Sequence, residues 1–191
     1  LSREVFARVQ AYLEQKGMAI DAVRQFKPWL VALTMVQLSY VQQGYDAALG
    51  VDQQVIEYAR LRGKRVLGLE SFKEQLSFFN QLFLEFPELK ADDLMLDTLE
   101  ELEQFSELPN VMMDAWLRAD LAAFEAIYLK TLNNNSFDRA AEKILISARN
   151  RRWVTTLEPL LESNAVLVAV GTLHFSGPNS LKKLLKSSFS M

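Results

Sequence analysis

His174 is the only histidine in this chain of 191 residues, and its position is what makes it a candidate for chemistry. It follows an apolar run from Val166 to Val170 that is rich in β-branched residues, a pattern typical of a strand buried on both faces. Gly171 and Gly177 flank it, and glycines let backbone approach a ligand closely. Because α/β sheets bind ligands beyond the carboxyl ends of their strands, the pattern predicts a functional histidine. The simpler interpretation is a structural histidine, hydrogen-bonded in a loop.

Glu70 occupies a similar position, directly after a second short strand predicted for residues 66–69. A carboxylate and an imidazole are half of a divalent-metal site, or an acid/base pair. They are not a whole zinc site, which normally has three protein ligands. The alternative is an acidic residue at a helix start, where the helix dipole favours it.

A basic cluster, Arg149-Asn150-Arg151-Arg152-Trp153, lies on a predicted helix. The spacing lets Arg149, Arg152 and Trp153 share one face. An arginine there can bind a substrate carboxylate or hold Glu70 in place. A solvated helix face is the alternative.

The composition excludes several kinds of site. The chain has no cysteine, which rules out disulfides, thiolate zinc sites and a cysteine nucleophile. The net charge of -3 and the small size of the basic cluster argue against a nucleic-acid partner. We see no nucleophile elbow, phosphate-binding glycine loop or dinucleotide fingerprint, and no apolar run long enough for a transmembrane segment.

Helical periodicity dominates the chain, and only the two strands at 66–69 and 166–170 are predicted. Ser71 and Glu74 have the spacing of a capping box at the start of a helix. We therefore predict an α/β (α+β) fold that is helix-dominated, with a small sheet flanked by helices. We expect a single domain over residues 1–191 with a helical insertion at about 72–135.

Several short motifs, taken in order, resemble the TraB/GumN family, which includes the membrane-anchored Tiki metalloproteases. The resemblance runs from about residue 20 to 180. The motifs are Lys27-Pro28-Trp29, Gly50-Val51-Asp52, Gly68-Leu69-Glu70-Ser71, the cluster at 149–153, and the run from Val170 to Pro178.

The resemblance implies a fold shared with erythromycin esterase-like and ChaN-like proteins. It also implies a site made of two Gly-x-x-His motifs, a glutamate and an arginine–asparagine pair. In this chain Gly171 to His174 is the second motif, and no first motif is present. We therefore expect a family member that is incomplete at its amino terminus and lacks its first strands.

The implied roles are as follows. His174 and Glu70 bind a divalent metal ion, with Glu70 as ligand or general base. Arg149 and Asn150 act in catalysis by positioning substrate or stabilising negative charge. Arg152 and Gly171 contact the substrate.

The resulting expectation is a metal-dependent hydrolase, a peptidase acting on a peptide or protein, that is inactive if the site is incomplete. The family resemblance implies a periplasmic, secreted or membrane-anchored parent protein. One alternative is a non-enzymatic ligand- or peptide-binding protein on the same fold. Another is a helical interaction domain whose incomplete edge is covered by a second copy in a homodimer.

Overall fold

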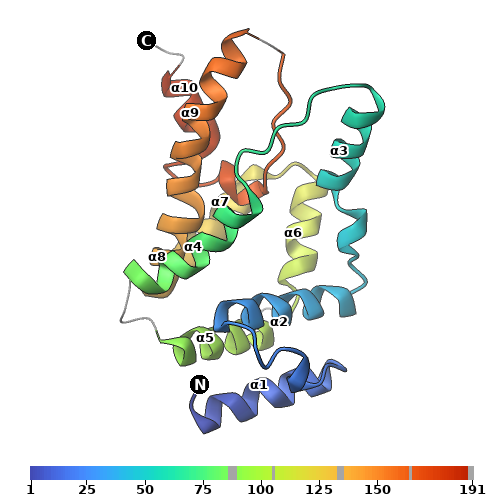
Figure 1. The fold of residues 1–191 in the computed structure, drawn as a ribbon, viewed down its shortest axis with the longest axis vertical. Helices are drawn as coiled ribbons and strands as arrows, with labels where there is room; N and C mark the ends of the chain where they lie inside the picture. The colour runs from blue at the N-terminus through green and yellow to red at the C-terminus, as the bar shows by residue number, and fades with distance from the viewer. Residues whose placement is uncertain (86–89, 105, 133–135, 164, 189–191) are drawn as a thin grey trace. The chain divides into compact units, whose positions relative to one another are not determined.

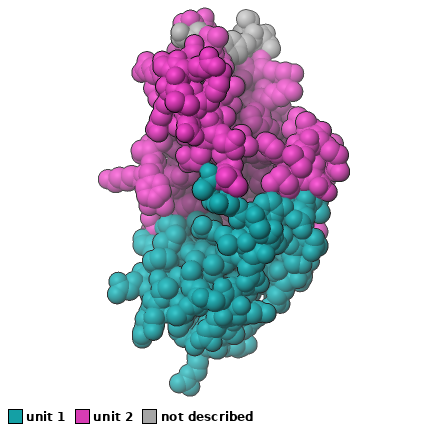
Figure 2. All heavy atoms as spheres, turned by 90° about the vertical axis from the view of Figure 1, so that its right-hand side faces the viewer, with its two compact units in different colours: residues 1–48, 86–111 teal, residues 49–85, 112–191 magenta. Residues whose placement is uncertain are grey.

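The computed structural model of the chain describes all residues except 86–89, 105, 133–135, 164 and 189–191. The chain forms two compact units, coloured separately in Figure 2. Unit 1 holds residues 1–48 and 86–111, and unit 2 holds residues 49–85 and 112–191. Two elements, η2 (Ala47–Leu49) and α6 (Leu108–Leu117), contribute residues to both units.

Unit 1 is built on α1 (Arg3–Gln15), η1 (Ile20–Ala22), α2 (Pro28–Gln42) and α5 (Ala91–Gln104). In Figure 1, α2 and α5 lie side by side, and α1 also packs against α5. The apolar residues that α1 buries recur every fourth position, so one stripe of the helix faces the core. These buried residues are Val5, Val9 and Leu13.

Unit 2 carries the candidate site. Its helices are α3 (Val51–Leu61), α4 (Phe72–Glu85), α7 (Leu121–Leu132), α8 (Ser136–Glu142), α9 (Ala148–Ser163) and α10 (Leu181–Ser188). Two short elements complete it: the π-helix η3 (Lys143–Ser147) joins α8 to α9, and the 3₁₀ helix η4 (Thr172–Phe175) precedes α10. α9 and α10 run together in Figure 1 and share a core of Trp153, Val154, Leu157 and Leu181.

The predicted sheet is wrong: the described residues contain helices and irregular segments and no strand. Residues 66–68 and 166–170 are irregular, Leu69 lies in a bend, and the two segments do not pair with one another. A β-branched run favours extended backbone, but a strand also requires a hydrogen-bonded neighbour, and neither segment has one in the described chain. Burial on both faces is wrong as well, since Leu67 is 48% exposed and Leu167 is 77% exposed.

The capping box is confirmed. The Glu74 carboxylate accepts from the Ser71 backbone N–H at 2.7 Å, and the Ser71 hydroxyl accepts from the Glu74 N–H at 3.2 Å. This fixes the start of α4 immediately after Glu70. None of the described helices is both long and apolar enough to cross a membrane. The prediction of one domain with an insertion at about 72–135, part of which lies outside the described residues, stays a prediction.

Unit 1 depends on Met95, which is fully buried in α5. Met95→Ala is expected to lower the free energy of unfolding by about 2–5 kcal/mol, because the removed side chain leaves a cavity. Glu100→Ala on the exposed face of the same helix is the control and should change it by less than about 0.5 kcal/mol. Chemical denaturation measures both. Equal effects of the two substitutions would contradict the assigned core.

Candidate functional site

Arg149 holds Glu70 through a side-on pair of hydrogen bonds. The Arg149 Nε donates to Glu70 Oε2 at 3.1 Å, and Nη2 donates to Oε1. The remaining Nη1 donates to the Leu145 carbonyl at 3.0 Å. Both side chains are largely buried, with 13% of Arg149 and 10% of Glu70 exposed. Of the two roles that the sequence left open for this arginine, the structure therefore shows it holding Glu70.

Arg152, one turn along α9, adds a second cation to this site. Its Nη2 lies 3.8 Å from Glu70 Oε2, and 46% of its side chain is exposed. The guanidinium lies over the Phe78 ring at 4.6 Å, while that of Arg149 lies over the Trp153 ring at 4.9 Å. Aromatic faces on α4 and α9 thus support both guanidinium groups. Arg152 also interacts electrostatically with the Glu74 carboxylate on α4, so the two arginines lie near two carboxylates.

His174 is buried in η4, with 6% of its surface exposed, and Asn150 fixes its orientation. The Asn150 Nδ2 donates to the backbone carbonyls of His174 at 3.1 Å and Asn179 at 2.8 Å. The amide oxygen therefore faces His174 Nδ1, at 2.7 Å. Because that oxygen can only accept, Nδ1 must carry the proton, which leaves a lone pair on Nε2. An imidazole in this tautomer is ready to bind a metal ion or accept a proton.

Burial and, to a smaller extent, the positive charge of Arg149 together lower the pKa of His174 to about 4. The imidazole is therefore neutral at pH 7. Its ring lies 4.4 Å from that of Trp153, which thus contacts both Arg149 and His174. The Trp153 indole N–H is buried and has no acceptor among the described residues. A buried donor without a partner is unfavourable, and a bound molecule that supplied an acceptor would relieve this.

The π-helix η3 ends at Ser147, two residues before Arg149, and no sequence pattern predicted it. Single π-helical turns often occur at functional sites. Ser147, its last residue, donates to the Glu142 carboxylate and accepts from Asn179 Nδ2 at 3.0 Å. Tyr128 also donates to Glu142, at 2.7 Å. This polar network fixes η3 and the Asn179 loop, whose carbonyl in turn holds Asn150.

The network also affects Tyr128. Burial raises the pKa of its hydroxyl, and the hydrogen bond to Glu142 raises it further, so the phenol stays protonated as a donor. Nothing in the sequence pattern pointed to Glu142, Ser147 or Asn179. Their spacing follows the π-helix and the loop, and apolar periodicity does not show either.

The two glycines near His174 differ in what they require. A Cβ at Gly171 would meet only His174 Cδ2 at 3.8 Å, an ordinary contact, so sterics do not demand glycine there. Gly177 has a φ of +81°, and a Cβ there would overlap the Tyr128 ring. Its N–H donates to the Glu125 carboxylate at 2.7 Å. Gly177 is therefore required by the fold, while substrate contact at Gly171 stays a prediction.

The structure brings Glu70, Arg149, Asn150, Arg152 and His174 into one region of unit 2. As a metal site, this set fits only in part. His174 is a suitable ligand, with Nε2 unprotonated. Both oxygens of Glu70 already accept from Arg149, and Arg152 disfavours a cation beside that carboxylate. Among the described residues, no group of three His, Cys, Asp or Glu side chains lies close enough to hold a metal ion.

Comparison with known proteins gives a consistent family match. The model of a family described as TraB/PrgY/gumN matches residues 1–188. The chain is 25% identical over 186 residues to the uncharacterized protein YbaP of Escherichia coli (strain K12), and equally to that of Shigella flexneri. The match covers 97% of the chain and 66% of each relative, so the chain spans about two thirds of their length. No solved structure matches.

The Glu70 pair gives a prediction about stability. Arg149→Ala should lower the free energy of unfolding by about 3–5 kcal/mol, because it leaves Glu70 buried without its main partner. Arg152→Ala should cost less than about 1 kcal/mol, because that arginine is half exposed. Chemical denaturation at neutral pH compares them. If Arg152→Ala cost as much as Arg149→Ala, the assignment of Arg149 as the residue that holds Glu70 would be wrong.

The lowered pKa of His174 gives a second prediction. The unfolded chain binds a proton near pH 6.5 and the folded chain only near pH 4, so stability should fall as the pH drops through this window. A His174→Gln variant should lose this part of the pH dependence. Since the chain has one histidine, ¹⁵N NMR can follow its ring alone. The proton should stay on Nδ1 at pH 7, and a ring protonated on Nε2 would contradict the tautomer.

Proposed function

Because the chain belongs to the TraB/PrgY/gumN family, we propose that it carries the site of a metal-dependent hydrolase acting on peptides. One observation supports this above the others: Asn150 holds a buried, neutral His174 with a lone pair on Nε2. Neutral imidazole whose other nitrogen donates a hydrogen bond is the usual state of a histidine metal ligand. His174 would hold a divalent ion together with ligands from outside this set. Such an ion supplies an activated water or a polarised carbonyl.

Glu70 would be the general base rather than a metal ligand. A carboxylate has about four acceptor positions, and Arg149 occupies two of them. Arg152 approaches without reaching hydrogen-bond distance, so an acceptor position remains for a water or substrate N–H. Arg149 is then a positioning residue, which keeps Glu70 in one orientation.

Arg152 would meet the negative charge of the substrate. It is the more exposed of the two arginines and lies within 4 Å of Glu70. In a site partly shielded from water, a guanidinium stabilises a carboxylate, or an oxyanion that develops during hydrolysis. The Trp153 N–H is a further donor without an acceptor among the described residues. A site in the periplasm or outside the cell stays an expectation from the resemblance.

The second candidate is a non-enzymatic protein that binds an anionic ligand or peptide. The observation in its favour is Arg152, whose guanidinium is 46% exposed and lies 3.8 Å from Glu70 Oε2, so it can still donate hydrogen bonds to an anion. Metal binding separates the two proposals, since a binding protein of this kind needs no ion at His174.

Titration with Zn²⁺ and with Mn²⁺, followed by calorimetry and by the ¹⁵N signal of the His174 ring, tests the hydrolase proposal. We expect binding of at least one ion with a shift at Nε2, and a loss of affinity of about tenfold or more in His174→Gln. Glu162→Gln, an exposed acidic residue on α9, is the control and should bind like the unaltered chain. Binding that shifts nothing at Nε2, or that His174→Gln does not change, would leave the anion-binding candidate.

A further inference from the structure

The backbone of the segment that leads into η4 makes no hydrogen bond with the described chain. From Val166 to Val170, no backbone N–H or C=O makes a hydrogen bond with any described residue. Five successive residues therefore carry backbone donors and acceptors that no described residue pairs with. Such a row is what a strand at the edge of a sheet offers to another chain.

The side chains of this segment alternate as they do in a strand. Val168 and Val170 pack on the core of α9 and α10, while Leu167 points away from it and is 77% exposed. Period-two alternation over an apolar run is the pattern of a strand with one buried face. The segment thus has the side-chain pattern of a strand, and no described residue pairs with its backbone.

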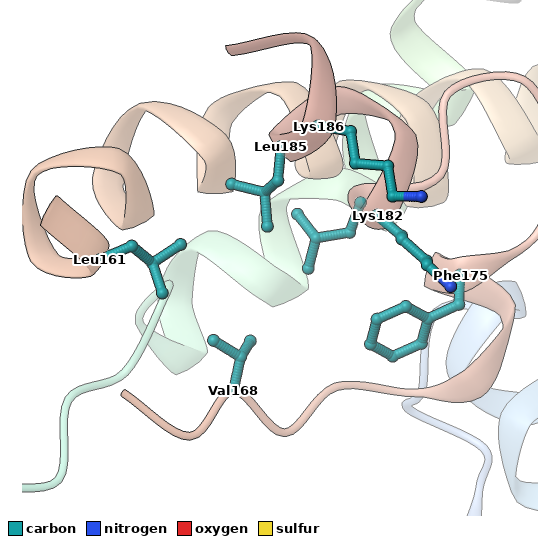
Figure 3. Close-up of a pocket in the computed structure, with 7 residues that line it drawn as sticks. Leu161, Val168, Phe175, Lys182, Leu185 and Lys186 are labelled. Atoms are coloured by element: carbon teal, nitrogen blue, oxygen red, sulfur yellow. The ribbon is translucent and has the colours of Figure 1, made fainter. Parts of the chain in front are cut away.

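An apolar groove lies on the inner side of this segment. It is a shallow, open groove with a volume of about 570 Å³. Its apolar lining comes from Leu161, Val168, Phe175, Leu181 and Leu185. Lys182 and Lys186, one turn apart on α10, add two positive charges to the lining. Figure 3 shows Val168 facing Leu161 and the side chain of Lys182 reaching toward Phe175.

We propose that this surface binds an extended peptide with apolar side chains and a carboxylate, which adds to Val166–Val170 as a β-strand. Main-chain hydrogen bonds would give affinity, and every second side chain would enter the groove beside Val168. A carboxylate of the peptide, at its C-terminus or on an acidic side chain, would lie against Lys182 and Lys186. An acyl chain could fill the groove too, but it would leave all the unpaired backbone groups without partners.

The inference rests on the proposed function and makes it more specific. The segment passes into η4, where His174 lies four residues after Val170. A peptide paired along the segment would therefore be held next to the candidate site. The substrate class would be extended, apolar peptides with a carboxylate.

The test is fluorescence anisotropy with a labelled peptide, Val-Thr-Val-Thr-Val-Ser, carrying a free C-terminal carboxylate. The whole chain is used, with EDTA present so that metal binding plays no part. We expect saturable binding below about 1 mM and a loss of about tenfold when alternate residues of the peptide are N-methylated, because two or three hydrogen bonds are removed.

Proline variants locate the pairing edge on the protein. Val166→Pro and Leu167→Pro remove N–H groups that face opposite edges, because successive N–H groups of a strand alternate. One of them should weaken binding about tenfold. The matched variants Val166→Thr and Leu167→Thr keep the N–H and should bind normally. Circular dichroism confirms that all four fold.

The charge is tested separately. Lys182→Gln should weaken binding of the peptide with a free C-terminal carboxylate about threefold. It should leave binding of the same peptide with an amidated C-terminus unchanged. Lys73→Gln, an exposed lysine of α4 that does not line the groove, should affect neither peptide.

Three results would overturn the proposal. The first is that the peptide does not bind saturably. The second is that neither N-methylation of the peptide nor the proline substitutions change its binding. The third is that the chain forms a dimer which the proline substitutions dissociate and the peptide does not. The last would mean that a second copy occupies the edge. Peptide binding by an unaltered chain that binds neither Zn²⁺ nor Mn²⁺ would support the docking and overturn the hydrolase proposal. Metal binding at His174 without peptide binding would support the hydrolase proposal and overturn the peptide docking.

Discussion

The buried pair between Arg149 and Glu70 is the interaction on which the rest of the site depends. It joins the segment between α3 and α4 to the first turn of α9, across 79 residues of sequence. A buried carboxylate is tolerable only while its partner stays in place, so the pair fixes both elements. Arg149 also contacts the Trp153 ring, and its charge acts on His174. The position of this one guanidinium therefore affects Glu70, Trp153 and His174 together.

The start of α9 has to be placed accurately for this pair to form, and the π-helix η3 contributes to that. A π-helical turn changes the rotation of the helix that follows, so it determines which α9 side chains face the site. The contact of Ser147 with Glu142 and Asn179 holds this turn. Arg149 and Asn150 consequently reach two different partners, Glu70 and His174, although they are adjacent in sequence.

The structure places Glu70, Arg149 and His174 in one region, as the sequence suggested, while their functional roles stay predictions and the predicted sheet is wrong. Glu70, Arg149 and His174 were identifiable because each is a reactive type in a restricted local setting: an end of an apolar run, or a basic cluster with helical spacing. The helices and the capping box at Ser71 followed from periodicity and spacing. The sheet did not follow, because an apolar run such as Val166–Val170 shows a preference for extended backbone but cannot show whether another strand pairs with it. The π-helix and the Glu142 network also leave no periodic signal.

Asparagine at position 150 gives His174 a hydrogen-bond acceptor without adding a charge next to Arg149. A histidine buried near Arg149 is stable only when neutral, since an imidazolium there would be both desolvated and repelled. An aspartate at position 150 would accept a hydrogen bond from Nδ1–H, but its negative charge would favour the imidazolium. It also could not donate to the carbonyls of His174 and Asn179. Asparagine accepts from Nδ1 without adding charge, and its Nδ2 satisfies both carbonyls. Because the amide is neutral, one buried cluster can contain both the Arg149 cation, which holds Glu70, and a His174 ring that is unprotonated at Nε2.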